Sequence, residues 1–503
     1  MASKHNQARS DGELNREREL KLECELGDIG KLLHHPVLRR ATALPQSGGL
    51  LRTTYFDTPD LALQQAGIAL RIRNHNGRFI QTIKAEGHRR GIALDRSEWE
   101  HEVDGNLDAN AAFETPLRPF FEDEAIRAHI QPLFSVKTIR RVFLIDTGRA
   151  TIELALDRMS ISACGRSSRA TELELELKAG EAREIFRVAK DLARALPLRL
   201  SMLAKSDRGY RLLDSYEPKP IKSRRPPVVA DTPSAVAFQM IARETLSQLV
   251  QNEELWRSSK DPEALHQMRV GLRRLRTAMA FFKPVLSGRR ARKINAELRW
   301  IGKKLNRARD LDVLLERLRS AHAEHPLGLN ASDVAQSRAA AYMKLAQKLE
   351  KPRFKRAILN TAIWIETGAW LEAASKKARK PVVRIATKAL ARRWKRICEE
   401  VNDIPELSTA KRHALRVRVK ALRYGGTFFA DVFKGHTGRK KALMKSLEHL
   451  QDVLGEMNDI AVGDAALANN RTSLPDSAEA VRALMPMAEA AARRMRSIRP
   501  FWE

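Results

Sequence analysis

Charged side chains occupy alternate positions in the N-terminal stretch ERELKLECEL, which covers residues 17–26. Glu17, Glu19, Lys21, Glu23 and Glu25 hold the alternate positions, and the residues between them are Arg18, Leu20, Leu22 and Cys24. Because side chains alternate across a strand, this spacing predicts a strand with five charges on one face. Carboxylates on such a face can hold hard divalent cations, and a lysine can bind phosphate oxygens.

Several later segments of the N-terminal half repeat this alternation. Their charged positions are Arg71, Arg73, Lys84, Arg96, Glu98, Glu100, Glu102, Arg140, Glu153, Asp157, Glu172, Glu174, Glu176 and Lys178. Half-exposed strands with charged outer faces would explain any single segment. The sorting of acidic and basic strands favours a closed sheet whose charged faces line a polar lumen, with apolar faces packed outward on helices. Such a lumen suits a metal-bound phosphate chain.

The formal net charge of +30 is concentrated in the second part of the 503-residue chain. Residues 1–220 hold 35 basic and 32 acidic side chains, whereas 221–503 hold 56 and 29. A positive excess of that size attracts polyanions, although a generally basic helical protein would share the composition. We find no recognition-helix or zinc-finger pattern, so we expect nucleic acid to bind only nonspecifically, if at all.

Cysteine spacing and the N-terminus favour a cytoplasmic protein without a membrane partner. Cys24, Cys164 and Cys398 lie far apart and form no metal or redox motif, which suits a reducing compartment. The first residues lack the apolar core of a signal peptide, and no uncharged apolar run is long enough to span a bilayer.

The chain divides into a β-rich part and a helical part. Residues 14–215 are rich in strand patterns, with an Asn-Gly hairpin signal in NHNGR and a helical period over 181–196. The proline-rich, basic segment 216–233 is typical of a linker. Residues 234–503 show only helical spacing, so the predicted fold class is α+β followed by all-α.

The helical part contains an internal repeat. The sequence HQMRVGLRRLR begins at His266 and HALRVRVKALR at His413; LNRARDLDV (305–313) likewise matches LGEMNDIAV (454–462). The two matches are offset by 147 and 149 residues, which predicts duplicated units at approximately 234–370 and 380–503. On a helix, the basic residues of each copy share one face, which is either a solvated surface or one wall of a polyanion groove. These residues are His266, Arg269, Arg273 and Arg276 in the first copy, and His413, Arg416, Lys420 and Arg423 in the second.

The ordered series of charged motifs resembles the CYTH superfamily, the triphosphate tunnel metalloenzymes. Glu17, Glu19 and Lys21 form the E-x-E-x-K pattern of its N-terminal signature. The resemblance continues in order through YFDTPD, LRIR, Lys84, Arg140, ALD, ELELEL and SMLAKSDRGY, and it covers roughly residues 14–214.

This resemblance implies an eight-stranded antiparallel tunnel that hydrolyses tripolyphosphate to pyrophosphate and phosphate. It implies Mg²⁺ or Mn²⁺ as cofactor, and the expected metal ligands are Glu17, Glu19, Glu174 and Glu176, with Glu172 as an alternative and Asp157 completing the shell. We expect Lys21 and Arg140 to act in catalysis. The residues expected to bind phosphate are Arg71, Arg73, Lys84, Arg96, Lys205 and Arg208. No general base is evident.

The repeated half resembles the CHAD domain, a conserved histidine α-helical domain, because His266 and His413 match its named histidines. That resemblance implies two four-helix bundles, and it implies that the two repeated basic faces bind inorganic polyphosphate. The fusion resembles bacterial inorganic triphosphatases. Two alternatives remain open: a polyphosphate-targeting protein with a weak or inactive tunnel, and a tunnel that takes thiamine triphosphate or ATP, the latter for adenylate cyclase chemistry.

Overall fold

The computed structural model describes residues 16–85, 94–286, 288–320, 331–372, 376–468 and 477–503. The chain forms two compact units. The first contains residues up to 221 together with 246–264 and 348–367. The second contains residues 222–245, 265–347 and 368–503.

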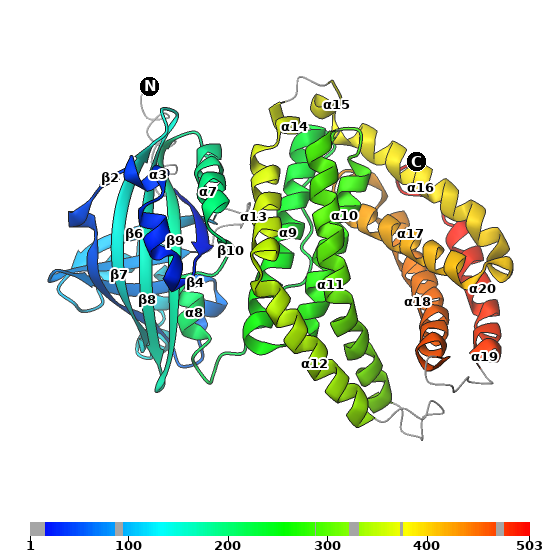
Figure 1. The fold of residues 1–503 in the computed structure, drawn as a ribbon, viewed down its shortest axis with the longest axis horizontal. Coiled ribbons are helices and arrows are strands. Elements are labelled where there is room, and N and C mark those ends of the chain that lie inside the picture. Colours follow the sequence, from blue (N-terminus) through cyan, green and yellow to red (C-terminus); the bar gives the residue numbers. More distant parts are fainter. Residues whose placement is uncertain (1–15, 86–93, 287, 321–330, 373–375, 469–476) are drawn as a thin grey trace. The chain divides into compact units, whose positions relative to one another are not determined.

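The first unit is built on one antiparallel sheet, whose strands curve around an interior (Figure 1). Its strands are β1 (Arg16–Glu23), β2 (Thr42–Ala43), β3 (Gly49–Asp57), β4 (Ile68–His75), β5 (Arg78–Ala85), β6 (Leu94–Val103), β7 (Gln131–Asp146), β8 (Ala150–Ala163), β9 (Arg166–Gly180) and β10 (Arg199–Ser201). Where the structure describes them, the predicted strand segments match these elements, except that β1 ends at Glu23, so Glu25 lies beyond the strand on which five charges were expected.

The pairing of this sheet closes on itself. The order runs β1-β6-β5-β4-β3-β7-β8-β9, and β9 pairs again with β1. Among the described residues, eight strands therefore complete a ring, while β10 pairs with β1 and β2 pairs with β7. The described sheet has ten strands, so the implied count of eight was too low. The two additional strands have two and three residues, which is too short to leave a periodic signal in the sequence.

The Asn-Gly signal was correct. Strand β4 turns directly into β5, with His75 opposite Arg78 and only Asn76 and Gly77 between them. Both central residues have positive φ, 53° and 86°, as the two-residue hairpin turn that suits twisted strands requires.

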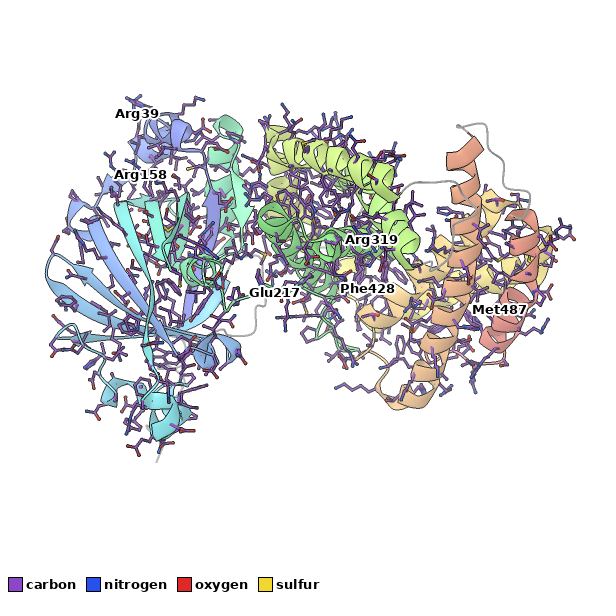
Figure 2. All side chains as sticks on the ribbon, turned by 90° about the horizontal axis from the view of Figure 1, so that it is seen from below. Arg39, Arg158, Glu217, Arg319, Phe428 and Met487 are labelled. Atoms are coloured by element: carbon purple, nitrogen blue, oxygen red, sulfur yellow. The ribbon has the colours of Figure 1, made fainter. Side chains whose placement is uncertain are left out.

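Alternation along the strands separates the apolar core from the charged interior. Leu20 and Leu22 of β1 and Leu173 and Leu175 of β9 are fully buried on the face opposite the charged residues. Burying each such leucine contributes roughly 2 kcal/mol. On β8 the exposed Arg158, labelled in Figure 2, directly follows a fully buried aspartate on the other face.

Helices flank this sheet in the first unit. The predicted helix at 181–196 is α7 (Arg183–Ala195), which contacts β9 and buries Ile185, Val188 and Leu192. The shorter helices are α2 (Ile29–Leu33), α3 (Pro36–Arg39), α4 (Ala62–Gln65), α5 (Arg118–Glu122), α6 (Glu124–Arg127) and α8 (Lys205–Tyr210). Helix α13 (Pro352–Thr367) and the C-terminal half of α9 (Ser234–Ser259) also belong to this unit.

The described secondary structure of the second unit is helical, apart from an isolated β-bridge between Pro233 and Pro381. Its further helices are α10 (Pro262–Phe281), α11 (Arg289–Ser320), α12 (Ala331–Glu350), α14 (Ala369–Glu372), α15 (Lys376–Arg379), α16 (Val382–Glu400), α17 (Thr409–Phe428), α18 (Thr437–Ala468), α19 (Ser477–Ala483) and α20 (Met485–Arg496). Phe428, labelled in Figure 2, is fully buried and packs edge-on against Phe281. Among the described helices, none has the length and apolar character needed to cross a bilayer.

The repeated motifs occupy equivalent helices. The two His-containing copies lie in α10 and α17, and the two Asp-containing copies lie in α11 and α18. The grouping of these helices into two four-helix bundles, like the predicted domain limits, stays a prediction.

Candidate functional site

A cavity of about 490 Å³ lies inside the ring of strands in the first unit. Every strand of the ring contributes to its lining, and α8 supplies the remainder. Its charged lining residues, among those the structure describes, are Glu19, Lys21, Arg71, Arg73, Lys84, Glu98, Glu100, Arg140, Glu153, Glu174, Glu176, Lys178 and Lys205. The sheet therefore turns acids and bases from seven of its strands toward one space, and β3 contributes Tyr55.

Nine of the predicted site residues line this cavity. They are Glu19, Lys21, Arg71, Arg73, Lys84, Arg140, Glu174, Glu176 and Lys205. Strand pairing places Glu17 directly opposite Arg96, but the side chains of both lie outside the described residues. The other predicted members, Asp157, Glu172 and Arg208, are not among the lining residues.

Lys21 is buried among carboxylates. Its ammonium lies 3.0 Å from Glu19 and 3.8 Å from Glu172, and it donates a hydrogen bond to Glu174. Burial alone would lower the pKa of Lys21, but the three carboxylates raise it well above its usual value. Lys21 is therefore a fixed cation that holds acidic side chains in place.

A second ionic cluster joins β7, β8, β9 and α8. Arg140 donates two hydrogen bonds to Asp157, at 2.8 and 2.6 Å, and one to Glu174 at 2.8 Å. The ammonium of Lys205 lies 2.9 Å from Asp157 and 2.7 Å from Glu174. Burial opposes ionisation of Glu174, yet Lys205, Lys21 and Arg140 hold its pKa well below the usual range. Asp157, which is fully buried and does not line the cavity, thus holds Arg140 and Lys205 in position.

Arg71 and Arg73 face the cavity from β4 with different partners. Arg71 hydrogen bonds to Tyr55 and lies 3.4 Å from Glu98. Arg73 makes no ion pair or hydrogen bond within the described residues. Repulsion from Arg71, burial and the charge of Arg140 lower the pKa of Arg73 to about 10. Tyr55 and Glu100 offset part of this repulsion, but among the described residues the guanidinium of Arg73 has no ion-pair or hydrogen-bond partner of its own.

The predicted metal and phosphate ligands leave out four charged lining residues and one aromatic residue. Alternation already placed Glu98, Glu100, Glu153 and Lys178 on the charged faces expected to line the lumen, and all four line the cavity, but no binding role was assigned to them. Glu98 lies opposite Lys84 in the strand register, and their charged atoms are 2.9 Å apart. Tyr55 carried no such signal, because a single tyrosine in a strand is usually a core residue.

Glu172 and Arg208 pair with each other away from the cavity lining. Arg208 donates hydrogen bonds to Glu23 at 2.7 Å and to Glu172 at 3.1 Å. Glu172 is fully buried, and one of its carboxylate oxygens has no hydrogen-bond partner in the described structure. Burial, with a contribution from Glu174, raises the pKa of Glu172. Their predicted roles in metal and phosphate binding stay predictions.

Basic residues of α10, α11 and α17 gather in the second unit. The charges of Arg273, Arg416, Arg423 and Arg269 all act on Lys420 and, with its burial, lower its pKa to about 7. The described residues thus bring together Arg269 and Arg273 from the first repeat with Arg416, Lys420 and Arg423 from the second; we call these five residues the basic cluster. Arg273 has a buried Nε atom without a partner in the described residues.

The remaining predicted residues of the basic faces lie beside this cluster. Burial and the charges of Arg309, Arg273, Lys420 and Arg269 lower the pKa of His266 to about 4. His413 hydrogen bonds to Asn458 at 2.7 Å. Arg276 donates to Asn295 at 3.4 Å.

Comparison with known families assigns both parts of the chain. Residues 15–210 match the CYTH domain and residues 240–468 match the CHAD domain. The chain is a CYTH domain followed by a CHAD domain. The closed sheet with its charged cavity is the CYTH domain, and the basic cluster lies in the CHAD domain.

The chain is also similar to individual curated and solved proteins. The inorganic triphosphatase of Haemophilus influenzae is 27% identical over 176 residues, which are 35% of this chain and 49% of that protein. The chain thus spans about half the length of this curated relative. A solved CHAD domain from Ricinus communis is 27% identical, covers 56% of this chain and 98% of its own, and has a TM-score of 0.48. A Hippeastrum adenylyl cyclase candidate described with a dominant triphosphatase activity is 18% identical, covers 40% and 98%, and has a TM-score of 0.31.

The CYTH cavity contains a row of carboxylates suited to a hard cation. Glu19 on β1 lies opposite Glu176 on β9, which lies opposite Glu153 on β8. Like charges directly opposite are unfavourable unless a cation neutralises them, and Lys178 lies 2.7 Å from Glu176 and 3.8 Å from Glu153. Among the described residues, no group of three or more His, Cys, Asp or Glu side chains is arranged as a complete metal site. Mg²⁺ needs only one or two carboxylates when a substrate phosphate and water supply the other oxygens, so the donor set fits.

Proposed function

We propose that this protein is a metal-dependent inorganic triphosphatase that hydrolyses tripolyphosphate to pyrophosphate and phosphate inside the CYTH cavity. Similarity to the Haemophilus influenzae inorganic triphosphatase supports this assignment. The proposal also requires a cavity that attracts a polyanion while keeping acidic groups for a divalent cation, and the lining contains both kinds of charge.

The observation that carries the proposal is Arg73. A half-buried guanidinium with no partner in the described residues, beside Arg71 and Arg140, is an arrangement that an anion would stabilise. Arginine binds phosphate oxygens through a planar fork of donors, which matches the substrate class. A purely structural cluster would be expected to provide a carboxylate for each buried cation.

The lining favours an inorganic substrate over a nucleotide or thiamine triphosphate. Its uncharged members in the described structure are Tyr55, Ala69, Ala155, Ala204 and Ser206. A purine or thiazolium ring is bound best on aromatic and apolar surface, of which Tyr55 is the largest part here. A chain of phosphates needs only charged and hydrogen-bonding neighbours.

In the proposed reaction, water attacks the terminal phosphorus in line with the bridging oxygen, and the departing pyrophosphate takes the electron pair of the broken P–O bond. Such a transfer is accelerated mainly by positioning and charge neutralisation. Arg71, Arg73 and Lys84 would bind the phosphate oxygens from β4 and β5. Arg140 and Lys205 would neutralise charge opposite them, held in place by Asp157.

One or two of Glu19, Glu174 and Glu176 would hold the divalent cation. When bound, that cation would neutralise phosphate charge and make an attacking water more acidic. Lys21 would keep Glu19 and Glu174 in position as a permanent ammonium. Its raised pKa makes it unsuited to act as a general base near neutral pH.

The deciding experiment measures phosphate release from tripolyphosphate, ATP and thiamine triphosphate with Mg²⁺ or Mn²⁺. We expect tripolyphosphate to have by far the highest kcat/KM, and Glu19→Gln to abolish its turnover while leaving the circular dichroism spectrum unchanged. Equal turnover of the three substrates would overturn the substrate assignment. Absence of turnover with tight tripolyphosphate binding would instead support a polyphosphate-targeting role.

We further propose that the CHAD domain binds inorganic polyphosphate at the basic cluster. The cluster joins equivalent helices of the two repeats, and the charges of four arginines act on Lys420. Two of these arginines also have carboxylate partners, Asp310 for Arg269 and Glu448 for Arg423. Buried like charges are costly, and a long polyanion would offset that cost.

Charge reversal in the full-length protein tests this second proposal. We expect Arg269→Glu combined with Arg416→Glu to weaken binding of long-chain polyphosphate at least tenfold. The control reverses Lys388 and Lys441, which are exposed and lie outside the basic cluster, and so produces the same change in net charge. If both double variants weaken binding equally, the attraction is nonspecific. If the Arg269/Arg416 variant binds polyphosphate as tightly as the wild type, the basic cluster is not the binding site.

A further inference from the structure

Asp57, at the end of β3, is a fully buried carboxylate that neutral donors stabilise. It accepts backbone N–H hydrogen bonds from Thr58 at 2.8 Å, Leu63 at 2.9 Å and Gln64 at 2.9 Å. Its fourth donor is the hydroxyl of Tyr210, at 2.8 Å. The described residues give Asp57 no ion pair. Three of these bonds organise the turn into α4, whereas the Tyr210 bond reaches a residue 153 positions away in the chain.

Tyr210 is the last residue of α8, and its surroundings fix that end of the helix. Its ring packs edge-on against Phe134, with centroids 5.1 Å apart. Gly209 lies so close to the same ring that an added Cβ atom would come within 2.0 Å of it. No side chain larger than hydrogen fits there, so α8 approaches β7 as closely as its backbone allows.

The first residue of α8 is Lys205, whose ammonium lies at the cavity between Asp157 and Glu174. Helix α8 has only six residues, and five steps of helical rise separate its ends by about 7.5 Å. So short a helix has little stability of its own and keeps its orientation only if both ends are held. Restraint at Tyr210 is therefore transmitted to Lys205.

We propose that the hydrogen bond from Tyr210 to Asp57 positions Lys205 for substrate, which makes Tyr210 and Asp57 positioning residues of the CYTH site. This inference rests on the proposed function, since it assigns Lys205 to a phosphate oxygen. It also connects two motifs that are far apart in sequence, because Asp57 belongs to YFDTPD and Tyr210 to SMLAKSDRGY.

A double-mutant cycle on the full-length protein tests the proposal. Tyr210→Phe removes the hydroxyl and keeps the ring against Phe134. We expect Tyr210→Phe to lower kcat/KM for tripolyphosphate about tenfold, and Lys205→Met to lower it further. In the Lys205→Met background, Tyr210→Phe should cost less than twofold, since the residue it positions is already absent. A cost that stays tenfold in both backgrounds would show a general structural role and overturn the proposal.

The matched control is Tyr342→Phe. The hydroxyl of Tyr342 donates to the buried Asp312 at 2.6 Å on α11, so the change removes the same type of bond outside the cavity. We expect that variant to lose stability without losing kcat/KM. An equal loss of kcat/KM in Tyr342→Phe would mean that lowered stability explains the Tyr210 effect.

A failure of the proposed function can be distinguished from a failure of this inference. If the wild-type protein does not hydrolyse tripolyphosphate, the same four proteins of the cycle are compared by the rise in Tm that tripolyphosphate produces. If tripolyphosphate does not bind either, the inference is tested by the urea unfolding midpoints of the same four proteins. Coupled midpoints for Tyr210→Phe and Lys205→Met would support the linkage through α8, and additive midpoints would refute it.

Discussion

Arg140 and Asp157 are direct partners in the register of β7 and β8, and the arginine places two hydrogen bonds on the aspartate across that pairing. The fully buried aspartate also lies 2.9 Å from Lys205. The carboxylate of Asp157 therefore orients two cavity-lining cations from different elements, Arg140 of β7 and Lys205 of α8.

Replacing Arg140 should therefore damage both stability and activity. Arg140→Ala leaves Asp157 with Lys205 as its remaining cation, and we expect the free energy of unfolding in urea to fall by about 3 kcal/mol. We expect kcat/KM for tripolyphosphate to fall roughly 100-fold, because a charge-neutralising donor is lost. Arg141→Ala is the control, since the neighbouring side chain is exposed on the other strand face. A stable, active Arg140→Ala variant would contradict this assignment.

The acidic residues of β9 should differ in importance. Glu172, Glu174 and Glu176 share one strand face, but only Glu174 and Glu176 line the cavity among the described residues. We expect Glu174→Gln to reduce kcat/KM at least 100-fold and to raise the Mg²⁺ concentration needed for half-maximal rate. Glu172→Gln should stay within about fivefold, because Glu172 does not line the cavity and is hydrogen bonded to Arg208 instead. An equal loss in a folded Glu172→Gln protein would place Glu172 among the metal ligands.

Much of the fold could be predicted because strand alternation and helical spacing are strong local signals. The alternation in ERELKLECEL and TELELELK correctly identified β1, β9 and the charged face that lines the cavity. It could not choose between Glu172 and its neighbours, since all three share the same periodicity. The residues differ in their contacts with α8: Glu174 accepts a hydrogen bond from Lys205, and Glu172 accepts one from Arg208. Such contacts are tertiary relationships.

The contacts between lining residues have a similar explanation. Alternation placed Lys178 and Glu153 on charged faces, but their ion pair depends on the register of β8 and β9, which the pattern of a single strand does not fix. The role of Tyr210 depends on a hydrogen bond to a residue in a distant strand. No local periodicity records such a contact.

Arg73 should reduce the stability of the ligand-free protein. Its pKa falls to about 10 in the folded state, below the ordinary value of an arginine, so the folded state disfavours its charged form relative to the unfolded state. We expect Arg73→Met to raise the free energy of unfolding by about 1–3 kcal/mol. The same variant should lose most of the rise in Tm that tripolyphosphate gives the wild type, since binding to the native state is weakened.

Arg78 provides the control for that experiment. It is an exposed arginine on the adjacent strand β5 that pairs with Glu102 at 2.7 Å. We expect Arg78→Met to change neither the stability nor the response to tripolyphosphate. If Arg73→Met instead destabilised the ligand-free protein, the guanidinium would have a structural partner and the argument for an anion at that position would fail.

Polyphosphate binding by the CHAD domain should weaken as pH rises above 7. Burial and the surrounding arginines lower the pKa of Lys420 to about 7, and a bound polyanion would raise it again by favouring the ammonium. Binding would then take up a proton above pH 7, so affinity should fall with rising pH by at most about tenfold per unit. Titration calorimetry in buffers of different ionisation enthalpy would measure that uptake. Lys420→Arg stays charged and should bind with little dependence on pH between 7 and 9, whereas a wild-type affinity that is flat over this range would refute a role for Lys420.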